Sequence, residues 1–235
     1  MTSLKDIRLY TTQPHSCSYL PEQRAQTLFI DPDFRIDKAH NSRLSEIGFR
    51  RSGAHVYRPN CEKCQQCVSC RVLVDGFAPN RRFQRIIKRN ADVVVSQVPD
   101  IVGDEYYQLY RKYITLRHAD GDMYPPSRDQ YNSFLLKQCE GTHYYAMHVA
   151  GRLIGLMVVD HLENGLSAVY TFYDPQEEKR SPGIFGILWQ LAEARRLGLA
   201  HLYLGYWIRD SRKMCYKIEF RPLELLIRQR WLLMT

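Results

Sequence analysis

The chain has 235 residues, of which 45% are hydrophobic and 25% are charged. This composition is that of an ordinary soluble globular protein, and it excludes a largely disordered or collagen-like chain. No apolar run reaches the roughly 20 residues that a membrane helix needs, and the first residues lack the apolar core of a signal peptide, so we expect a cytoplasmic protein.

The net charge of +8 is concentrated in one segment. Residues 35–90 hold 13 basic and four acidic side chains, and the rest of the chain is nearly neutral. A compact basic excess favours a negatively charged partner, most simply a nucleic acid. A basic surface that is merely solvated is the alternative.

The first hundred residues predict short, irregular elements. Residues 40–47 predict a brief helix that ends at Gly48, and residues 49–58 predict a hairpin around Gly53. Pro99 marks a break near residue 100. We therefore expect a smaller N-terminal part over residues 1–100 and a C-terminal domain over residues 101–235.

A helix with a basic face is predicted after Asn80, a typical helix cap. Phe83, Ile86 and Ile87 have the spacing of an amphipathic helix. The segment carries five cations and no acid: Arg81, Arg82, Arg85, Lys88 and Arg89. Like charges one turn apart repel each other, so this arrangement favours an anionic partner. Such a face contacts phosphates without distinguishing sequence.

Seven cysteines are present, and four of them form a run with two-residue spacing: Cys61, Cys64, Cys67 and Cys70. The odd total and the absence of an export signal argue against a disulfide framework. Thiols with this spacing can chelate one ion. The run therefore predicts a zinc or iron–sulfur site, with Cys17 or His15 as a further ligand. A thiol-rich turn that stays reduced in the cytosol is the alternative.

The remainder of the chain predicts a regular series of elements. They are a strand over 92–98, helices over 104–117 and 127–138, strands over 143–149, 153–161 and 166–173, a helix over 182–197, and strands over 201–204 and 223–233. This is the order of the N-acetyltransferase-type (GNAT-type) acyltransferase fold, an α+β architecture whose mixed sheet splays open between two strands. An acyl donor enters that gap, and the turn before the long helix receives its phosphates.

The sequence of that turn, residues 180–186, indicates which acyl donor the protein can bind. Enzymes that use acetyl-coenzyme A have the pattern [Q/R]-x-x-G-x-[G/A], which Arg180 and Gly183 match. However, Pro182 removes a backbone amide, and Phe185 stands where a small residue is needed. Coenzyme A is therefore disfavoured, and a larger phosphate-bearing donor held by a basic segment fits better.

Several long motifs resemble the aminoacyl-tRNA–protein transferase family. They are residues 13–20 (QPHSCSYL), 57–67 (YRPNCEKCQQC), 88–90 (KRN), 117–127 (RHADGDMYPPS), 168–175 (AVYTFYDP) and 203–208 (YLGYWI). The resemblance runs in the family's order over about residues 8–232. Cys70 lies outside these motifs, so the resemblance does not extend to a site made of the four-cysteine run alone.

The resemblance implies an aminoacyltransferase. The bacterial branch, to which the chain is most similar, transfers leucine from leucyl-tRNA to proteins that begin with Asp or Glu and so marks them for degradation. The eukaryotic branch transfers arginine, and the residues themselves do not choose between the two. Implied partners are leucyl-tRNA and the acceptor proteins, and the chemistry needs no cofactor. A coenzyme A-dependent N-acetyltransferase and a non-enzymatic nucleic-acid-binding module are the alternatives.

The expected site residues follow from this chemistry. Because the donor ester is already activated, the protein has to position both partners and stabilise the oxyanion. Candidate catalytic residues are Asp120, Asp122, His118 and Tyr170 as general bases and Tyr206 as the acid for the leaving ribose oxygen. The expected tRNA contacts are Arg81, Arg82, Arg85, Lys88 and Arg89, the expected acceptor contacts are Arg117, Lys213 and Lys217, and the expected metal ligands are Cys17, Cys61, Cys64 and Cys67. A purely structural role is the alternative for each.

Overall fold

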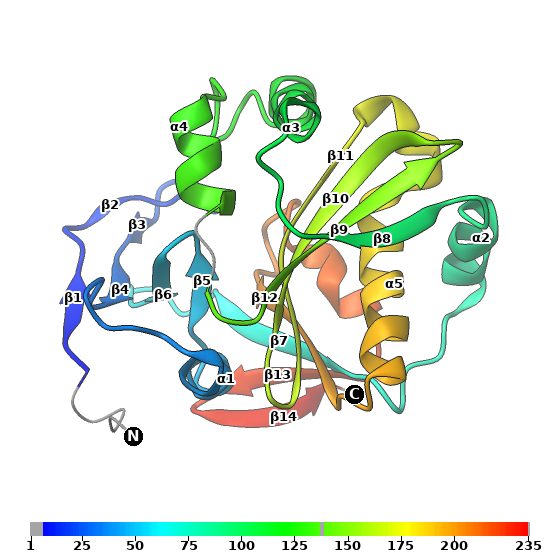
Figure 1. The fold of residues 1–235 in the computed structure, drawn as a ribbon. Coiled ribbons are helices and arrows are strands. Elements are labelled where there is room, and N and C mark those ends of the chain that lie inside the picture. The colour runs from blue at the N-terminus through cyan, green and yellow to red at the C-terminus, as the bar shows by residue number, and fades with distance from the viewer. Residues whose placement is uncertain (1–6, 137–138, 235) are drawn as a thin grey trace.

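An eight-stranded mixed sheet runs through the molecule (Figure 1). The computed structural model describes residues 7–136 and 139–234. From edge to edge the strands are β14 (Arg230–Met234), β13 (Leu223–Ile227), β7 (Val68–Leu73), β12 (His201–Trp207), β11 (Gly165–Tyr173), β10 (Arg152–His161), β9 (Thr142–Val149) and β8 (Val94–Val98). β11 and β12 are parallel, and every other neighbouring pair is antiparallel.

Helices cover both faces of this sheet, which is why its central strands are apolar on both sides. Along β9 and β10, successive residues alternate between the two cores. Tyr145 and Met157 pack with α5 (Pro182–Arg196), whereas Tyr144 and Leu156 pack with α3 (Asp104–Arg117). Within the described ranges, no helix is both long and apolar enough to cross a membrane.

The predicted basic helix is present as α2 (Arg81–Arg89). The Asn80 side chain accepts a hydrogen bond from the Phe83 amide at 2.9 Å, as expected for a cap. Phe83 stacks on Phe220 with ring centroids 4.8 Å apart, so the apolar side of the helix packs on the core. Ile87, which the spacing places on this apolar side, does not pack there, because its side chain is 42% exposed.

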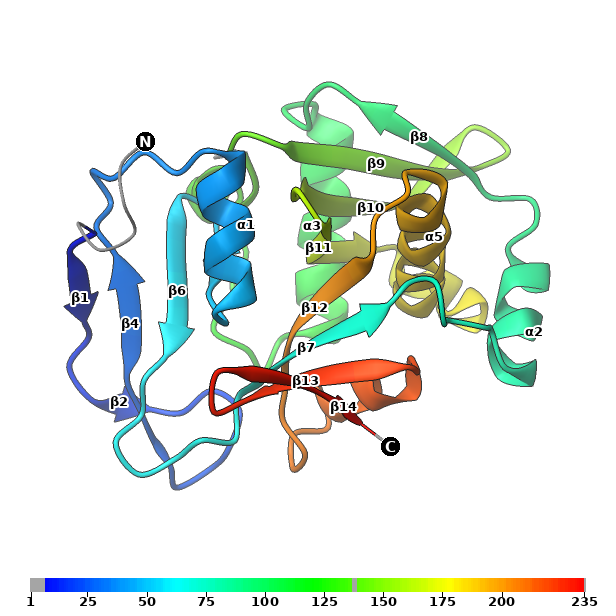
Figure 2. The same cartoon turned by 90° about the horizontal axis from the view of Figure 1, so that it is seen from below.

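The N-terminal residues form a smaller sheet beside the large one (Figure 2). Its strands, in order, are β1 (Leu9–Thr11), β4 (Thr27–Ile30), β6 (His55–Pro59) and β5 (Arg50–Ser52), and β2 (His15–Ser16) pairs separately with β3 (Arg24–Ala25). Helix α1 (Lys38–Glu46) begins at the Asp37 cap and closes a small core that contains Leu44 and Phe49.

A buried ion pair fastens the small sheet to the large one. Arg51 of β5 donates to both carboxylate oxygens of Asp160 of β10 at 2.7 Å, and the two side chains are 1% and 2% exposed. Thr142 and Asn41 donate to the same carboxylate. Removing one partner of such a pair typically costs about 3–5 kcal/mol. The position of β5 on the large sheet is therefore strongly determined.

Most predicted elements are confirmed, with two departures. The predicted helix over 127–138 begins at the Ser127 cap as α4 (Arg128–Tyr131) but continues as the π-helical turn η2 (Asn132–Leu136), and residues 137–138 lie outside the described residues. The single strand predicted over 223–233 is wrong, because β13 and β14 form a hairpin. Its two turn residues, Arg228 and Gln229, have φ of 49° and 62°, the geometry of a tight hairpin turn.

The division of the chain into a part over residues 1–100 and a domain over residues 101–235 stays a prediction. Two strands that precede residue 100, β7 and β8, lie in the same large sheet as the strands that follow it. The sheet is therefore built from both parts of the chain.

Candidate functional site

The large sheet opens between its two parallel strands. β11 pairs with β12 only over residues 165–167 and 201–203, although β11 continues to Tyr173 and β12 to Trp207. Each strand also has an irregularity just beyond the last pair. Val169 is skipped in the register of β11 with β10, and Leu204 is skipped in the register of β12 with β7. Such bulges are common next to active sites, and we call this opening the fork.

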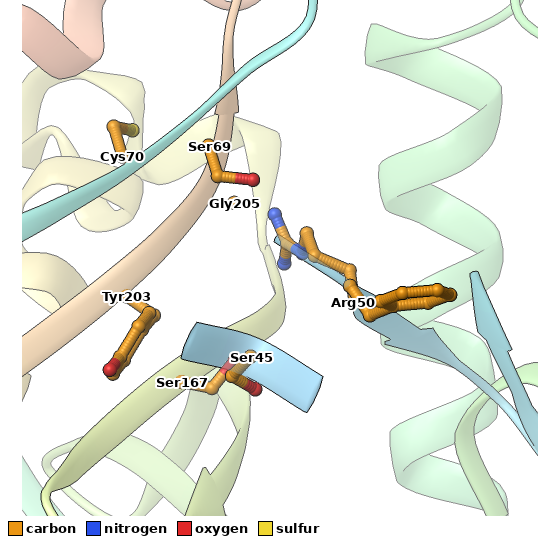
Figure 3. Close-up of a pocket in the computed structure, with 8 residues that line it drawn as sticks. Ser45, Arg50, Ser69, Cys70, Ser167, Tyr203 and Gly205 are labelled. Carbon is orange, nitrogen blue, oxygen red and sulfur yellow. The ribbon is translucent and has the colours of Figure 1, made fainter. Parts of the chain in front are cut away.

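Arg50 of β5 fills the start of the fork (Figure 3). One terminal nitrogen donates to the Ala168 carbonyl at 2.7 Å and to the Val169 carbonyl at 3.3 Å, and the other donates to the Leu204 carbonyl at 3.1 Å. The guanidinium thus bonds to carbonyls of both separating strands. It therefore bridges the two strands at the point where their pairing with each other ends.

Gly205 makes room for this guanidinium. Its φ is +75°, which favours glycine. A Cβ atom built at Gly205 would overlap the guanidinium of Arg50. A small cavity beside it, with room for about one water molecule, is lined by Ser45, Phe49, Arg50, Ser69, Cys70, Ser167, Tyr203 and Gly205.

A second cation is buried close to the fork. Lys217 is 5% exposed, and its Nζ donates to the Tyr206 carbonyl at 2.6 Å and lies 3.2 Å from the Met214 sulfur. Burial, together with Arg50, lowers the pKa of Lys217 to about 8, while the Cys70 and Cys67 thiols oppose this shift. In the described part of the chain, neither Arg50 nor Lys217 has a hydrogen bond or ion pair with a carboxylate.

Of the two candidate tyrosines, Tyr206 is buried and Tyr170 is half-buried. The Tyr206 hydroxyl lies 2.9 Å from the Gly48 carbonyl and 3.2 Å from the Tyr57 carbonyl, so it ties β12 to the small sheet. The Tyr170 hydroxyl lies 3.6 Å from the Met123 sulfur, and burial raises the pKa of Tyr170 well above its usual range. Both roles stay predictions.

His118 lies at the end of α3, against an aromatic cluster. Its Nε2 is 3.0 Å from the Tyr113 hydroxyl. Burial, with Lys213 and Arg117 nearby, lowers the pKa of His118, and Asp120 partly opposes this. The imidazole is therefore neutral at neutral pH and able to accept a proton, which is what a general base requires.

The charged residues expected at the acceptor site already have partners. Asp120 pairs with Lys213 at 2.9 Å, and Arg117 pairs with Glu178 at 2.6 Å. Asp122 accepts a hydrogen bond from the Ser18 hydroxyl at 2.6 Å. Residues 118–126 are thus tied to the N-terminal segment and to the 209–214 loop. The expected grouping of Arg117 with the two acids in one pocket stays a prediction.

The basic residues divide into buried and exposed groups. All five cations of α2 are exposed, although Arg82 pairs with Glu219 and Arg89 donates to the Lys179 carbonyl. Among the contacts of the described residues, no acid pairs with the other three: Arg81, Arg85 and Lys88. By contrast, Arg50 and Arg51 bond to the large sheet. The net charge of residues 35–90 is therefore larger than the positive charge that this segment presents to solvent.

The end of α2 adjoins the turn before α5. The Asn90 side chain donates to the Arg180 carbonyl at 2.9 Å. Arg180 itself pairs with Asp92 at 2.7 Å and with Glu177 at 2.9 Å. The exposed basic face of α2 is therefore next to the helix that crosses from β11 to β12.

The thiols separate into two sets. The pKa of the Cys67 thiol is raised to about 12 by burial and by the neighbouring Cys17, Cys61 and Cys64. Cys70 instead lies on β7 in the core and lines the fork cavity. Within residues 7–136 and 139–234, no three His, Cys, Asp or Glu side chains are placed to hold a metal ion. Metal binding by the four expected ligands stays a prediction, and it would require loss of thiol protons.

Sequence analysis missed Arg50 and Gly205. The available signals were two adjacent arginines entering a predicted hairpin and a lone glycine among the large residues of the 203–208 motif. A glycine inside a strand pattern often marks a bulge or a close approach. Neither signal identifies its partner, because Arg50 is 118 and 154 residues from Ala168 and Leu204.

Comparisons with known proteins agree along the whole chain. The family described as "Arginine-tRNA-protein transferase, N terminus" matches residues 15–85, and the corresponding C terminus matches residues 105–227. Proteins named aspartate/glutamate leucyltransferase from Pseudomonas fluorescens and Pseudomonas paraeruginosa are 55% and 54% identical, over 100% of both chains.

Two solved structures are distantly similar. The structure of L-PGS from Bacillus licheniformis has a TM-score of 0.43 at 11% identity and covers 62% of this chain and 46% of that chain. The C-terminal domain of a putative lysylphosphatidylglycerol synthetase from Agrobacterium fabrum has a TM-score of 0.44 at 13% identity and covers 71% and 51%. At these scores the similarity adds nothing to the argument.

The lowered pKa of Lys217 predicts a pH-dependent stability. Between about pH 8 and pH 10.5 the unfolded chain binds this proton and the folded chain does not. The free energy of unfolding therefore rises with pH because of Lys217, by at most roughly 3 kcal/mol. Lys217→Met should lose this rise in denaturant titrations across that range. The control Lys213→Met should keep the wild-type profile, and equal profiles for wild type and Lys217→Met would contradict the lowered pKa.

Proposed function

The chain belongs to the arginine-tRNA-protein transferase family, and on this premise we propose that it transfers leucine from leucyl-tRNA to the N-terminal α-amine of proteins that begin with Asp or Glu. The names of its full-length relatives support the choice of leucine and of these acceptors. The product carries leucine as its new first residue, and we propose that this marks it for degradation. Because the donor is a charged tRNA, the reaction belongs in the cytoplasm.

We assign the large sheet to the GNAT-type acyltransferase fold. Support comes from the antiparallel series β9, β10 and β11, followed by the crossover helix α5 and the parallel strand β12. The observation that carries the proposal is the fork between these two strands, because the pairing of an otherwise continuous sheet ends there, and we propose that the acyl group lies beyond Arg50 where the strands have separated.

The proposed reaction forms one bond and breaks another. The acceptor's α-nitrogen bonds to the carbonyl carbon of the ester, and the bond from that carbon to the ribose oxygen breaks. The proton that the amine loses goes to the ribose oxygen. His118 is neutral because its pKa is lowered, so the ring nitrogen that carries no proton can accept this proton and return it. The protein's further contribution is to position the two substrates and to stabilise the negative charge of the intermediate.

We propose that the tRNA lies on α2. Its exposed cations adjoin the turn before α5, and α5 leads from one strand of the fork to the other. A nucleic-acid backbone on this face would bring the 3′ end of the tRNA toward the fork. The contacts involve phosphates, so this surface supplies affinity and the fork supplies the chemistry.

The function is tested by transfer of radiolabelled amino acids. Leucyl-tRNA, arginyl-tRNA and acetyl-coenzyme A are supplied as donors, with acceptor peptides that differ only in the first residue. We expect transfer of leucine alone, to Asp and Glu peptides. Asn and Gln peptides have nearly the same shape but no charge, and we expect efficiencies at least about 30-fold lower, because a desolvated charge pair is worth about 2–5 kcal/mol.

Three results would contradict the proposal. Transfer of arginine from arginyl-tRNA would contradict the choice of leucine. Transfer of an acetyl group from acetyl-coenzyme A would contradict tRNA as the donor. Equal efficiency with Asp and Asn peptides would eliminate recognition of the acidic side chain.

The tRNA surface is tested by salt dependence. Arg81→Gln with Arg85→Gln removes two exposed cations one turn apart, so fewer counterions are released on binding. We expect weaker tRNA binding and a slope of log affinity against log salt that is shallower by about 1 to 2. The control Arg43→Gln with Arg111→Gln removes the same charge from α1 and α3. An equal loss in both double variants would contradict a specific role for α2.

A further inference from the structure

Within the described residues, the hydrogen bonds of the Arg50 side chain all go to main-chain carbonyls of strands that have separated. Its contacts are the Ala168 and Val169 carbonyls of β11 and the Leu204 carbonyl of β12. In a continuous sheet, carbonyls at this position would accept from the neighbouring strand. The guanidinium therefore replaces the missing pairing with one rigid group.

The contacts coincide with the two bulges. Val169 and Leu204 are the residues skipped in the register of β11 and of β12, and each accepts from Arg50. Their spacing across the fork therefore depends on the size of a guanidinium. Gly205, which lacks a side chain and has a positive φ, leaves the space that the group needs. Arg50, the two bulges and Gly205 are thus far apart in the sequence but together set the geometry of the fork.

The charge at this place is also unusual. Arg50 and Lys217 bond to carbonyl oxygens, and among the described residues neither bonds to a carboxylate. Lys217 is buried and Arg50 is half-buried, and buried cations are normally paired with an acid, as Arg51 is with Asp160. The positive charge at the fork is therefore available to a negatively charged group of a substrate. In the proposed transfer, the carbonyl oxygen of the ester becomes negative as the amine attacks.

We propose that Arg50 is the positioning residue for the transfer: it fixes the width of the fork and directs a positive charge at the place where the leucyl carbonyl is held. This inference rests on the proposed function. It also means that the N-terminal part contributes to the acyl site, because β5 supplies the side chain that separates β11 from β12.

The test uses the full-length protein with Arg50→Ala and Arg50→Lys. We expect kcat for leucine transfer to fall about 100-fold in Arg50→Ala, while KM for the tRNA and for the peptide changes by less than about twofold, since the negative charge that faces Arg50 forms only during the reaction. Arg50→Lys should stay well below wild type, because a compact ammonium on a flexible stem does not have the width or the rigid planar geometry of the guanidinium. Added methylguanidinium should restore a large part of kcat to Arg50→Ala.

Arg195 provides the matched control. It also donates only to main-chain carbonyls, those of Val74 at 2.6 Å and Phe77 at 2.7 Å, but it lies at the far end of α5 from the fork. Arg195→Ala should lower the melting temperature without lowering kcat of the folded protein, and methylguanidinium should not raise its rate.

The outcomes separate the inference from the function on which it rests. A wild-type protein that transfers leucine, with an Arg50→Ala variant of unchanged kcat, overturns only the role of Arg50. An equal loss of kcat in Arg195→Ala, or a folded Arg50→Ala variant that methylguanidinium does not rescue, also overturns it. If Arg50→Ala does not fold, Arg50→Lys replaces it in the test, and a wild-type kcat in that variant overturns the role of Arg50. Failure of the wild-type protein to transfer leucine counts against the proposed function instead.

Discussion

The guanidinium of Arg50, held between two strands that have parted, is the constraint on which the rest of the site depends. β11 and β12 pair over three residues, and beyond that point they no longer pair with each other. Arg50 of the small sheet donates to carbonyls of both strands there. The next residue, Arg51, fixes the same strand to Asp160. Two consecutive side chains of β5 therefore join the small sheet to the large one and hold the large sheet open.

This arrangement gives the basic residues two different tasks. Arg50 and Lys217 lie at the fork, where a positive charge without a bonded acid suits chemistry that develops a negative charge. The exposed ones on α2 suit a polyanion, because Arg81, Arg85 and Lys88 lie on the surface. The turn before α5 connects the two regions, and its Arg180 is already engaged by Asp92 and Glu177. Affinity for the donor and chemistry on its ester are thus placed on neighbouring but separate surfaces.

Sequence patterns predicted the local features well, because their causes are local. The Asn80 cap, the hairpin around Gly53 and the strand series from Thr142 to Tyr173 each depend on neighbouring residues. The β13–β14 hairpin was missed because Arg228 and Gln229 are not typical turn residues, and an apolar stretch of that length also fits one strand. The opening of the sheet was predicted from the order of the elements, which is that of the GNAT-type fold. Arg50 could not be connected to it, because side-chain bonds across more than 100 residues leave no periodic trace.

The central claim is that the fork between β11 and β12 is where the leucyl group is transferred. It is tested most directly by a crystal structure of the protein with a non-hydrolysable donor, in which an amide replaces the ester between leucine and the 3′-terminal adenosine of tRNA. We predict that the leucyl carbonyl lies at the fork beside Arg50, with the guanidinium still bonded to Val169 and Leu204 and the adenosine toward the turn before α5. A leucyl group bound away from the fork, or a guanidinium displaced from both strands, would contradict the account.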